Sequence, residues 1–129
     1  MGAHRAISSK DETALKAAAA SLDFLIVTVN VPMNWSALIQ TLRPQGRLHV
    51  VGAVLEPIPI NAFDLIMAQR SVSGSPTGSP DQIATMLEFA ARHQAIPQVE
   101  HFPMSKVNEA IKHLHDGKAR YRIVLDAGK

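Results

Sequence analysis

Three apolar runs in this chain have the residues of β-strands, and each is followed by small or hydroxyl-bearing residues and then by a segment of helical character. The runs are Phe24–Thr28, Arg47–Gly52 and Ser71–Gly78. A parallel strand that is covered by helices reads as a continuous apolar run, and such sheets bind ligands at the carboxyl ends of their strands. We therefore expect an α/β fold with a partial, Rossmann-like parallel sheet, helices on both faces, and a wall that a ligand approaches closely.

The segments between and after these runs carry helix signals. Asn34, Asn61 and Ser79 stand at N-cap positions, and Pro80 occupies the first helical position after Ser79. The sequence predicts helices over Asp11–Leu22, Trp35–Leu42, Ala62–Gln69, Pro80–Arg92 and Lys106–Asp116, the last capped by Ser105 and ended by Gly117. It also predicts short strands over Ala3–Ile7, Pro97–Phe102 and Tyr121–Leu125. This alternation favours βαβ units in a single domain, residues 1–129.

Composition argues against several classes of protein. The chain has no cysteine, which excludes a disulfide framework and a thiolate zinc site and fits a reducing, cytoplasmic compartment. Its net charge of +2 and its basic cluster Lys118–Arg122, which lacks an aromatic platform, do not indicate nucleic-acid binding. Apolar stretches such as Phe24–Val31 are far shorter than the roughly 20 residues of a membrane-spanning helix. The sequence contains neither of two common phosphate-binding motifs, Gly-x-Gly-x-x-Gly and Gly-x-x-x-x-Gly-Lys.

Side chains with the spacing of a catalytic or metal site are not evident. His113 and His115 lie two residues apart on a predicted helix, so they face different directions, and surface positions are expected for them. His49 lies within a predicted strand, where a packed or hydrogen-bonded side chain is favoured over a metal ligand. Glu100 and Asp116 show no partner spacing for acid–base catalysis. The sequence therefore assigns no catalytic and no metal-binding residue.

Several linked motifs occur in an order that resembles a known family. They are Gly2–Ser9, Asp23–Asn30, Leu42–Ala53, Gly74–Ser79, Met86–Ala90 and Ala119–Leu125. Together they resemble the second half of the nucleotide-binding domain in zinc-containing alcohol dehydrogenases, in particular the cinnamyl-alcohol-dehydrogenase-like branch of the medium-chain dehydrogenase/reductase superfamily. The resemblance implies the C-terminal portion of a dinucleotide-binding domain, without the catalytic zinc domain and without the glycine-rich turn for the cofactor pyrophosphate.

The resemblance also implies which residues line the cofactor. The strand-end positions are Thr28 and Val29, Gly52 and Ala53, and Gly74, Ser75, Pro76 and Thr77, and Arg122 matches a tail segment near the pyrophosphate. In the complete enzyme of this family the cofactor is NADP or NAD, and zinc belongs to the catalytic domain. For this chain the resemblance implies no zinc and at most weak nucleotide binding.

Each of these positions also has a purely structural interpretation. Gly52 can simply end a strand, and Thr28 can be an ordinary β-branched strand residue. The segment Gly74–Gly78 has the composition of a turn, and Pro76 stands where a Gly-x-Ser-x-Gly nucleophile elbow requires serine.

Three functions are compatible with these residues. The first is a cofactor-binding-domain fragment of an NAD(P)-dependent zinc alcohol dehydrogenase, inactive in isolation. The second is a non-enzymatic module that self-associates or binds a nucleotide weakly, and the third is a small hydrolase, which Pro76 disfavours. The resemblance also implies a homodimer or a larger assembly, because the sheet order of the family would leave the strands Phe24–Val29 and Arg70–Ser75 at the two edges of the sheet.

Overall fold

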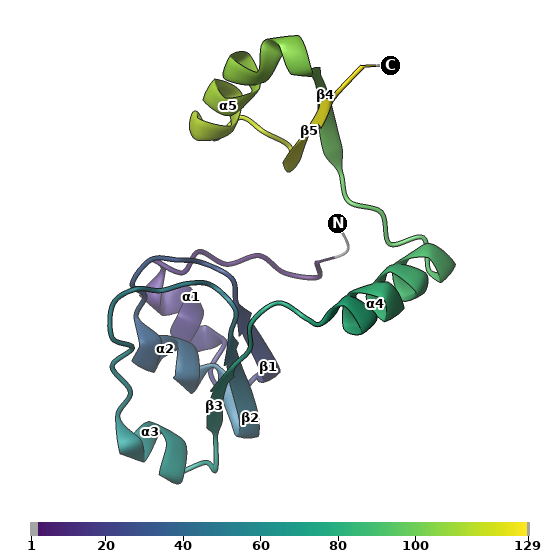
Figure 1. The fold of residues 1–129 in the computed structure, drawn as a ribbon. Helices are drawn as coiled ribbons and strands as arrows, with labels where there is room; N and C mark the ends of the chain where they lie inside the picture. Colours follow the sequence, from purple (N-terminus) through teal and green to yellow (C-terminus); the bar gives the residue numbers. More distant parts are fainter. Residues whose placement is uncertain (1–2, 129) are drawn as a thin grey trace. The chain divides into compact units, whose positions relative to one another are not determined.

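The computed structural model describes residues 3–128, which divide into two compact units at Thr77 and Gly78. The expectation of a single domain stays a prediction. The first unit contains α1 (Glu12–Ala17), β1 (Leu22–Val27), α2 (Trp35–Gln40), β2 (Leu42–Val50), α3 (Ala62–Ile66) and β3 (Ser71–Gly74), as Figure 1 shows. The second contains α4 (Pro80–Arg92), β4 (Val99–Pro103), the 3₁₀ turn η1 (Met104–Lys106), α5 (Val107–His115) and β5 (Arg122–Asp126).

The first unit is built on a three-stranded parallel sheet in the order β1–β2–β3. Side chains alternate between the two faces of the sheet, and Val27 and Leu48 point to the face that packs on helices. The buried core consists of Leu15, Val27, Trp35, Leu38, Ile39, Leu42 and Leu48. These residues join α1 and α2 to the sheet, and Ile39, Leu42 and Leu48 are completely buried.

The other face of the sheet carries a mixed set of side chains. Phe24 and Ile26 of β1 are about half exposed, at 48% and 54%. In the sheet register Ile26 lies opposite His49 and His49 lies opposite Ser73, so an apolar, an aromatic and a hydroxyl side chain cross this face in one row. Parallel strands combined with helices confirm the predicted α/β class.

The second unit has a two-stranded parallel sheet of β4 and β5, with α5 between them in the chain. Ser79 caps α4 through a reciprocal capping box with Gln82, as its sequence predicts. Gly117 ends α5 with a φ of 68°, its N–H donates to the carbonyl of Leu114, and the N–H of Lys118 donates to that of His113. This pairing is a Schellman motif, which confirms the predicted role of Gly117.

The predicted helices Trp35–Leu42 and Ala62–Gln69 end early, at Gln40 and Ile66, and three further local predictions are wrong. Ala3–Ile7 forms no strand, and Arg5 and Ile7 instead line a cavity beside α1. The first helix ends at Ala17 rather than Leu22, because Ala20 turns with a φ of 52° and donates its N–H to the carbonyl of Gln40. Ser105 does not cap α5, because it lies inside η1 and the N-cap position falls on Lys106. Among the described residues, no helix is both long enough and apolar enough to cross a membrane.

Candidate functional site

The carboxyl ends of β1, β2 and β3 meet at one edge of the first unit. The N–H groups of Val51 and Gly52 both donate to the carbonyl of Val27, each at 3.0 Å. The N–H of Ser75 donates to the carbonyl of Val50 at 3.3 Å. These bonds continue the backbone pairing of neighbouring segments beyond the last residues of the strands. The predicted site residues of the first unit therefore lie on three adjacent strand ends.

Most of the predicted positions at this edge are open to solvent. Gly52 is half-buried, and the exposed positions are Thr28, Val29, Ala53, Gly74, Ser75, Pro76 and Thr77. A cavity of about 150 Å³ adjoins the end of β1 and includes Thr28, Val29 and Met33 in its lining. This cavity adjoins the β1 part of the edge, and its lining does not include the predicted positions that follow β2 and β3.

Gly52 has a structural task in this arrangement. A Cβ atom added to it would collide with the carbonyl oxygen of Val29 and would lie 2.8 Å from the carbonyl carbon of Thr28. The missing side chain therefore lets the ends of β1 and β2 pack backbone against backbone. This contact requires glycine whether or not a ligand is bound, and it supports the structural interpretation of Gly52 beside the functional one.

A histidine links two of the strand-end hydroxyl groups. Nδ1 of His49 is 2.9 Å from Oγ of Ser73, and Nε2 of His49 is 2.9 Å from Oγ of Ser75. The ring of Phe24 stacks on the imidazole, with ring centroids 6.0 Å apart and planes inclined by 28°. The expectation of a packed or hydrogen-bonded His49 is confirmed, but its contact with the predicted site residue Ser75 was not foreseen. Alternation along β3 places Ser73 and Ser75 on one face, but only the register of β2 against β3 brings that face to His49.

Arg122 belongs to the second unit. It begins β5, lies opposite Val99 of β4 in the sheet register and is exposed. Its predicted approach to a cofactor pyrophosphate stays a prediction, because it is described with a different unit from the strand ends.

Glu100 and His113 form a second polar cluster. Nε2 of His113 is 2.8 Å from Oε2 of Glu100, whose Oε1 accepts the backbone N–H of Arg120 at 2.6 Å. His113 is therefore half-buried and hydrogen-bonded to Glu100, and not on the open surface as its sequence position predicts. The pairing joins α5, β4 and the loop before β5, and its place between these elements indicates a structural role.

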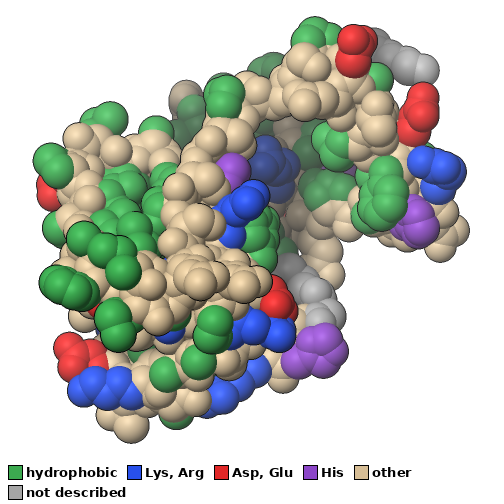
Figure 2. Space-filling view, turned by 90° about the horizontal axis from the view of Figure 1, so that it is seen from below, with side chains coloured by type: hydrophobic (Ala, Val, Ile, Leu, Met, Phe, Trp, Pro, Cys, Tyr) green, Lys and Arg blue, Asp and Glu red, His purple; other side chains and the backbone are tan. Residues whose placement is uncertain are grey.

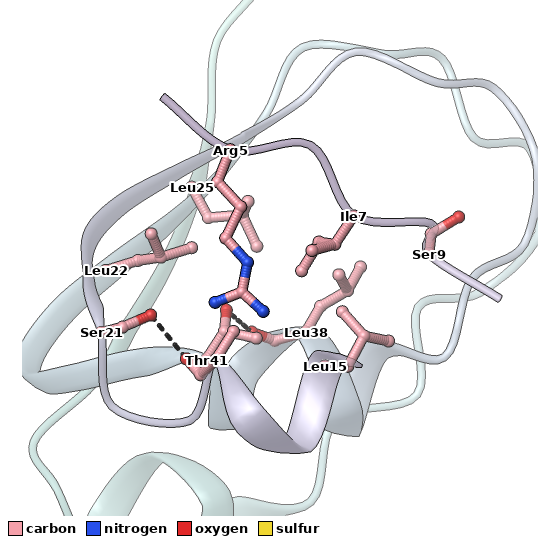
Figure 3. Close-up of a pocket in the computed structure, with 10 residues that line it drawn as sticks. Arg5, Ile7, Ser9, Leu15, Ser21, Leu22, Leu25, Leu38 and Thr41 are labelled. Atoms are coloured by element: carbon pink, nitrogen blue, oxygen red, sulfur yellow. Dashed lines mark hydrogen bonds between the residues drawn. The ribbon is translucent and has the colours of Figure 1, made fainter. Parts of the chain in front are cut away.

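A larger, apolar cavity lies elsewhere in the first unit. It has a volume of about 350 Å³ and lies between the N-terminal segment, α1, α2 and the start of β1 (Figure 3). Its lining includes Arg5, Ile7, Leu15, Leu22 and Leu38. Because Leu22 begins β1, this cavity lies at the amino end of that strand and not at the edge that carries Ser75.

Charged groups and apolar groups are interspersed on the surface that Figure 2 shows. Among residues 3–128, no three histidine, aspartate, glutamate or cysteine side chains gather in a way that could hold a metal ion. The donor set of the described residues therefore does not fit a zinc ion.

Comparisons with known proteins give a consistent result. The family model described as zinc-binding dehydrogenase matches residues 1–92. The chain is 51% identical over 129 residues to the aldehyde reductase AdhA of Synechocystis sp., covering 100% of this chain and 38% of that protein. It thus spans little more than a third of the length of this curated relative.

Solved structures of dehydrogenases that are similar to the chain include the following two. A cinnamyl alcohol dehydrogenase from Sorghum bicolor has a TM-score of 0.90 and 36% identity, over 99% of this chain and 37% of that one. The CAD of Helicobacter pylori in complex with NADP(H) has a TM-score of 0.72 and 28% identity, over 87% of this chain and 33% of that one.

Proposed function

The chain belongs to the zinc-binding dehydrogenase family, and from that premise we propose that its strand ends form the nicotinamide side of the cofactor site in an NAD(P)-dependent alcohol or aldehyde oxidoreductase. One observation carries the proposal: the predicted residues Thr28, Gly52 and Ser75 lie on three adjacent strand ends at a single edge of the sheet. Carboxyl ends of parallel strands are the usual ligand-binding edge of such folds.

Relatives support the choice of cofactor and substrate class. The Helicobacter structure contains NADP(H), and the names of the Synechocystis and Sorghum proteins describe an aldehyde reductase and a cinnamyl alcohol dehydrogenase. We therefore propose NADP or NAD as cofactor and primary alcohols or aldehydes as substrates of the complete enzyme. The absence of cysteine supports a cytoplasmic location as a further part of this proposal.

The chain's own residues would bind and orient the cofactor. The nicotinamide supplies the hydride when bound. Exposed small residues such as Ala53 and Gly74 leave room for a flat ring at the strand ends, and the Ser75 hydroxyl offers it a polar contact. None of the roles that we assign to these residues involves zinc, because the described residues offer no group of histidine, cysteine, aspartate or glutamate side chains that could hold it.

The test is titration of the 129-residue protein with NADPH, followed by calorimetry and by amide NMR spectra. We expect a dissociation constant from high micromolar to millimolar, or about 4 to 6 kcal/mol, because the chain contains no Gly-x-Gly-x-x-Gly turn for the pyrophosphate. Shifts should concentrate at Thr28, Gly52, Ala53 and Ser75. Sub-micromolar affinity would reveal a phosphate site outside this proposal, and shifts confined to other residues would contradict it.

The same protein should bind no stoichiometric zinc and should not reduce cinnamaldehyde with NADPH. Zinc analysis of the purified protein and an absorbance assay of NADPH consumption measure both. Turnover that depends on bound zinc would contradict the proposal that these residues serve only to bind and orient the cofactor.

Self-association is the second candidate function. β1 and β3 are the edge strands of the three-stranded sheet, so each has one side that is not paired within this sheet. Such edges pair readily with strands of another chain. We propose a homodimer or a larger assembly in which the Arg70–Ser75 edge pairs with its counterpart in a second copy.

A further inference from the structure

We propose that His49 is a positioning residue that fixes the Ser75 hydroxyl as a hydrogen-bond acceptor for the amide group of a nicotinamide ring. The inference rests on the proposed function, since it assigns a task to one residue of the cofactor edge. It goes beyond that function by accounting for a partly buried histidine on the face of the sheet that carries Phe24 and Ile26.

Both nitrogen atoms of the His49 ring are engaged by hydroxyl groups. Oγ of Ser73 is 2.9 Å from Nδ1, and Oγ of Ser75 is 2.9 Å from Nε2. Phe24 of the neighbouring strand stacks on the same ring. His49 and Ser73 are partly buried, whereas Ser75 is exposed, so the network leads from the sheet to the surface.

The direction of the hydrogen bonds is part of the proposal. Oγ of Ser73 lies 3.5 Å from the carbonyl oxygen of Leu48, which can only accept, and in the network that we assign the Ser73 proton points to this oxygen. The Ser73 oxygen then accepts the Nδ1–H of His49. A neutral imidazole has a single N–H, so Nε2 carries the lone pair and accepts the proton of Ser75. We assign this tautomer from the network of partners.

The consequence concerns what Ser75 offers to a ligand. Its single proton is held by Nε2 of His49, so its remaining lone pairs are free to accept a hydrogen bond. The carboxamide of nicotinamide carries two N–H donors. A hydroxyl whose rotation is already fixed loses less freedom when the ligand binds, and this preorganisation raises affinity.

A matched pair of variants separates this role from simple packing. A glutamine side chain in place of His49 is long enough to bring its amide oxygen, an acceptor, near the position of Nε2, whereas asparagine is shorter and reaches only the position of Nδ1. We therefore compare His49→Gln with His49→Asn by titration with reduced nicotinamide mononucleotide, followed by amide NMR spectra. His49→Gln should bind within about twofold of the parent protein, and His49→Asn should bind about three- to tenfold more weakly, the value of one hydrogen bond.

Two further measurements test the role of His49 without relying on the single His49 variants. Ser75→Ala, a change at an exposed position, should weaken binding by about three- to tenfold, and adding His49→Asn to it should cause no further loss. Long-range proton–nitrogen NMR spectra of the parent imidazole should show a protonated Nδ1 and an unprotonated Nε2 at His49.

Each outcome decides between the two levels of the proposal. If reduced nicotinamide mononucleotide causes no shifts at the strand ends of the parent protein, the proposed function fails and the role of His49 fails with it. If it binds and His49→Asn binds equally well, only the role of His49 is overturned. A protonated Nε2 would also overturn it. Covalent labelling of Ser75 by a fluorophosphonate would overturn it as well, because Ser75 would then be a nucleophile that His49 activates.

Discussion

Arg70 donates a hydrogen bond from Nε to the backbone carbonyl of Leu42, at a distance of 2.9 Å. The same guanidinium donates from Nη1 to the carbonyl of Asp64 at 3.2 Å and to Oε1 of Gln40 at 3.3 Å. The carboxylate of Asp64 in turn accepts bonds from Gln40 and Ser36. One partly buried arginine thus joins the start of β3 to α2, α3 and the start of β2.

We expect Arg70→Met to destabilise the first unit by about 1.5 to 3 kcal/mol, because three acceptors lose a charged donor while the side-chain volume is nearly kept. Urea denaturation followed by circular dichroism measures the change. Arg47→Met, at an exposed position of β2, is the matched control and should change stability by less than about 0.5 kcal/mol. Equal effects of the two variants would contradict the anchoring role of Arg70.

Gly52→Ala should destabilise the fold by about 2 to 3 kcal/mol, because the new Cβ meets the backbone of Val29, which cannot move aside without displacing the end of β1. Gly74→Ala is the control in the same unit, since the nearest atom to its Cβ would be the carbonyl oxygen of Val50 at 3.1 Å. Its effect should be clearly smaller. Chemical denaturation of both variants gives the comparison, and a neutral Gly52→Ala would show that the strand ends are not so closely packed.

Local signals account for the parts of the fold that the sequence predicts well. The helix α4 has the predicted bounds Pro80–Arg92, because Ser79, Pro80 and Gln82 form a start signal that needs no partner from elsewhere in the chain. The strand β1 covers most of the predicted Phe24–Thr28, since its apolar residues are contiguous.

Contacts between distant segments account for what the sequence does not predict. Ala20 would continue a helix by propensity, but the carbonyl of Gln40 captures its N–H and the chain turns there. The link between His49 and Ser75 requires the register of β2 against β3, which places residues 26 positions apart side by side. Composition and periodicity do not specify such a register.

Acid should weaken the C-terminal end of α5. Side-chain hydrogen bonds from Lys112 and then Lys118 hold the pKa of Asp116 below its usual value. A carboxylate whose folded pKa is depressed contributes stability above its unfolded pKa of about 3.9, and that contribution is lost as the pH falls through the lower, folded pKa.

Carbon NMR titration of the Asp116 carboxyl group measures this effect. Lys112→Met should raise the pKa of Asp116 toward its usual value, and Lys118→Met should raise it less, since the bond from Lys112 is the larger cause. High salt should reduce the difference between the parent protein and both variants, because the side chains of both lysines are exposed and dissolved ions screen their attraction to Asp116. An Asp116 pKa that neither variant alters would contradict the assigned cause.

The edge of β3 should mediate self-association. The N–H of Ser75 donates to Val50 of β2, and N–H groups alternate in direction along a strand, so the N–H of Val72 points to the free side of β3. Two copies related by a two-fold axis can pair these free sides without any new sequence feature.

Val72→Pro removes one such donor, so it should convert a dimer to a monomer at micromolar concentration in sedimentation equilibrium. Val72→Ala, which trims the same partly buried side chain but keeps the N–H, should remain dimeric. A monomeric parent protein, or an unchanged dimer for Val72→Pro, would show that this edge does not pair.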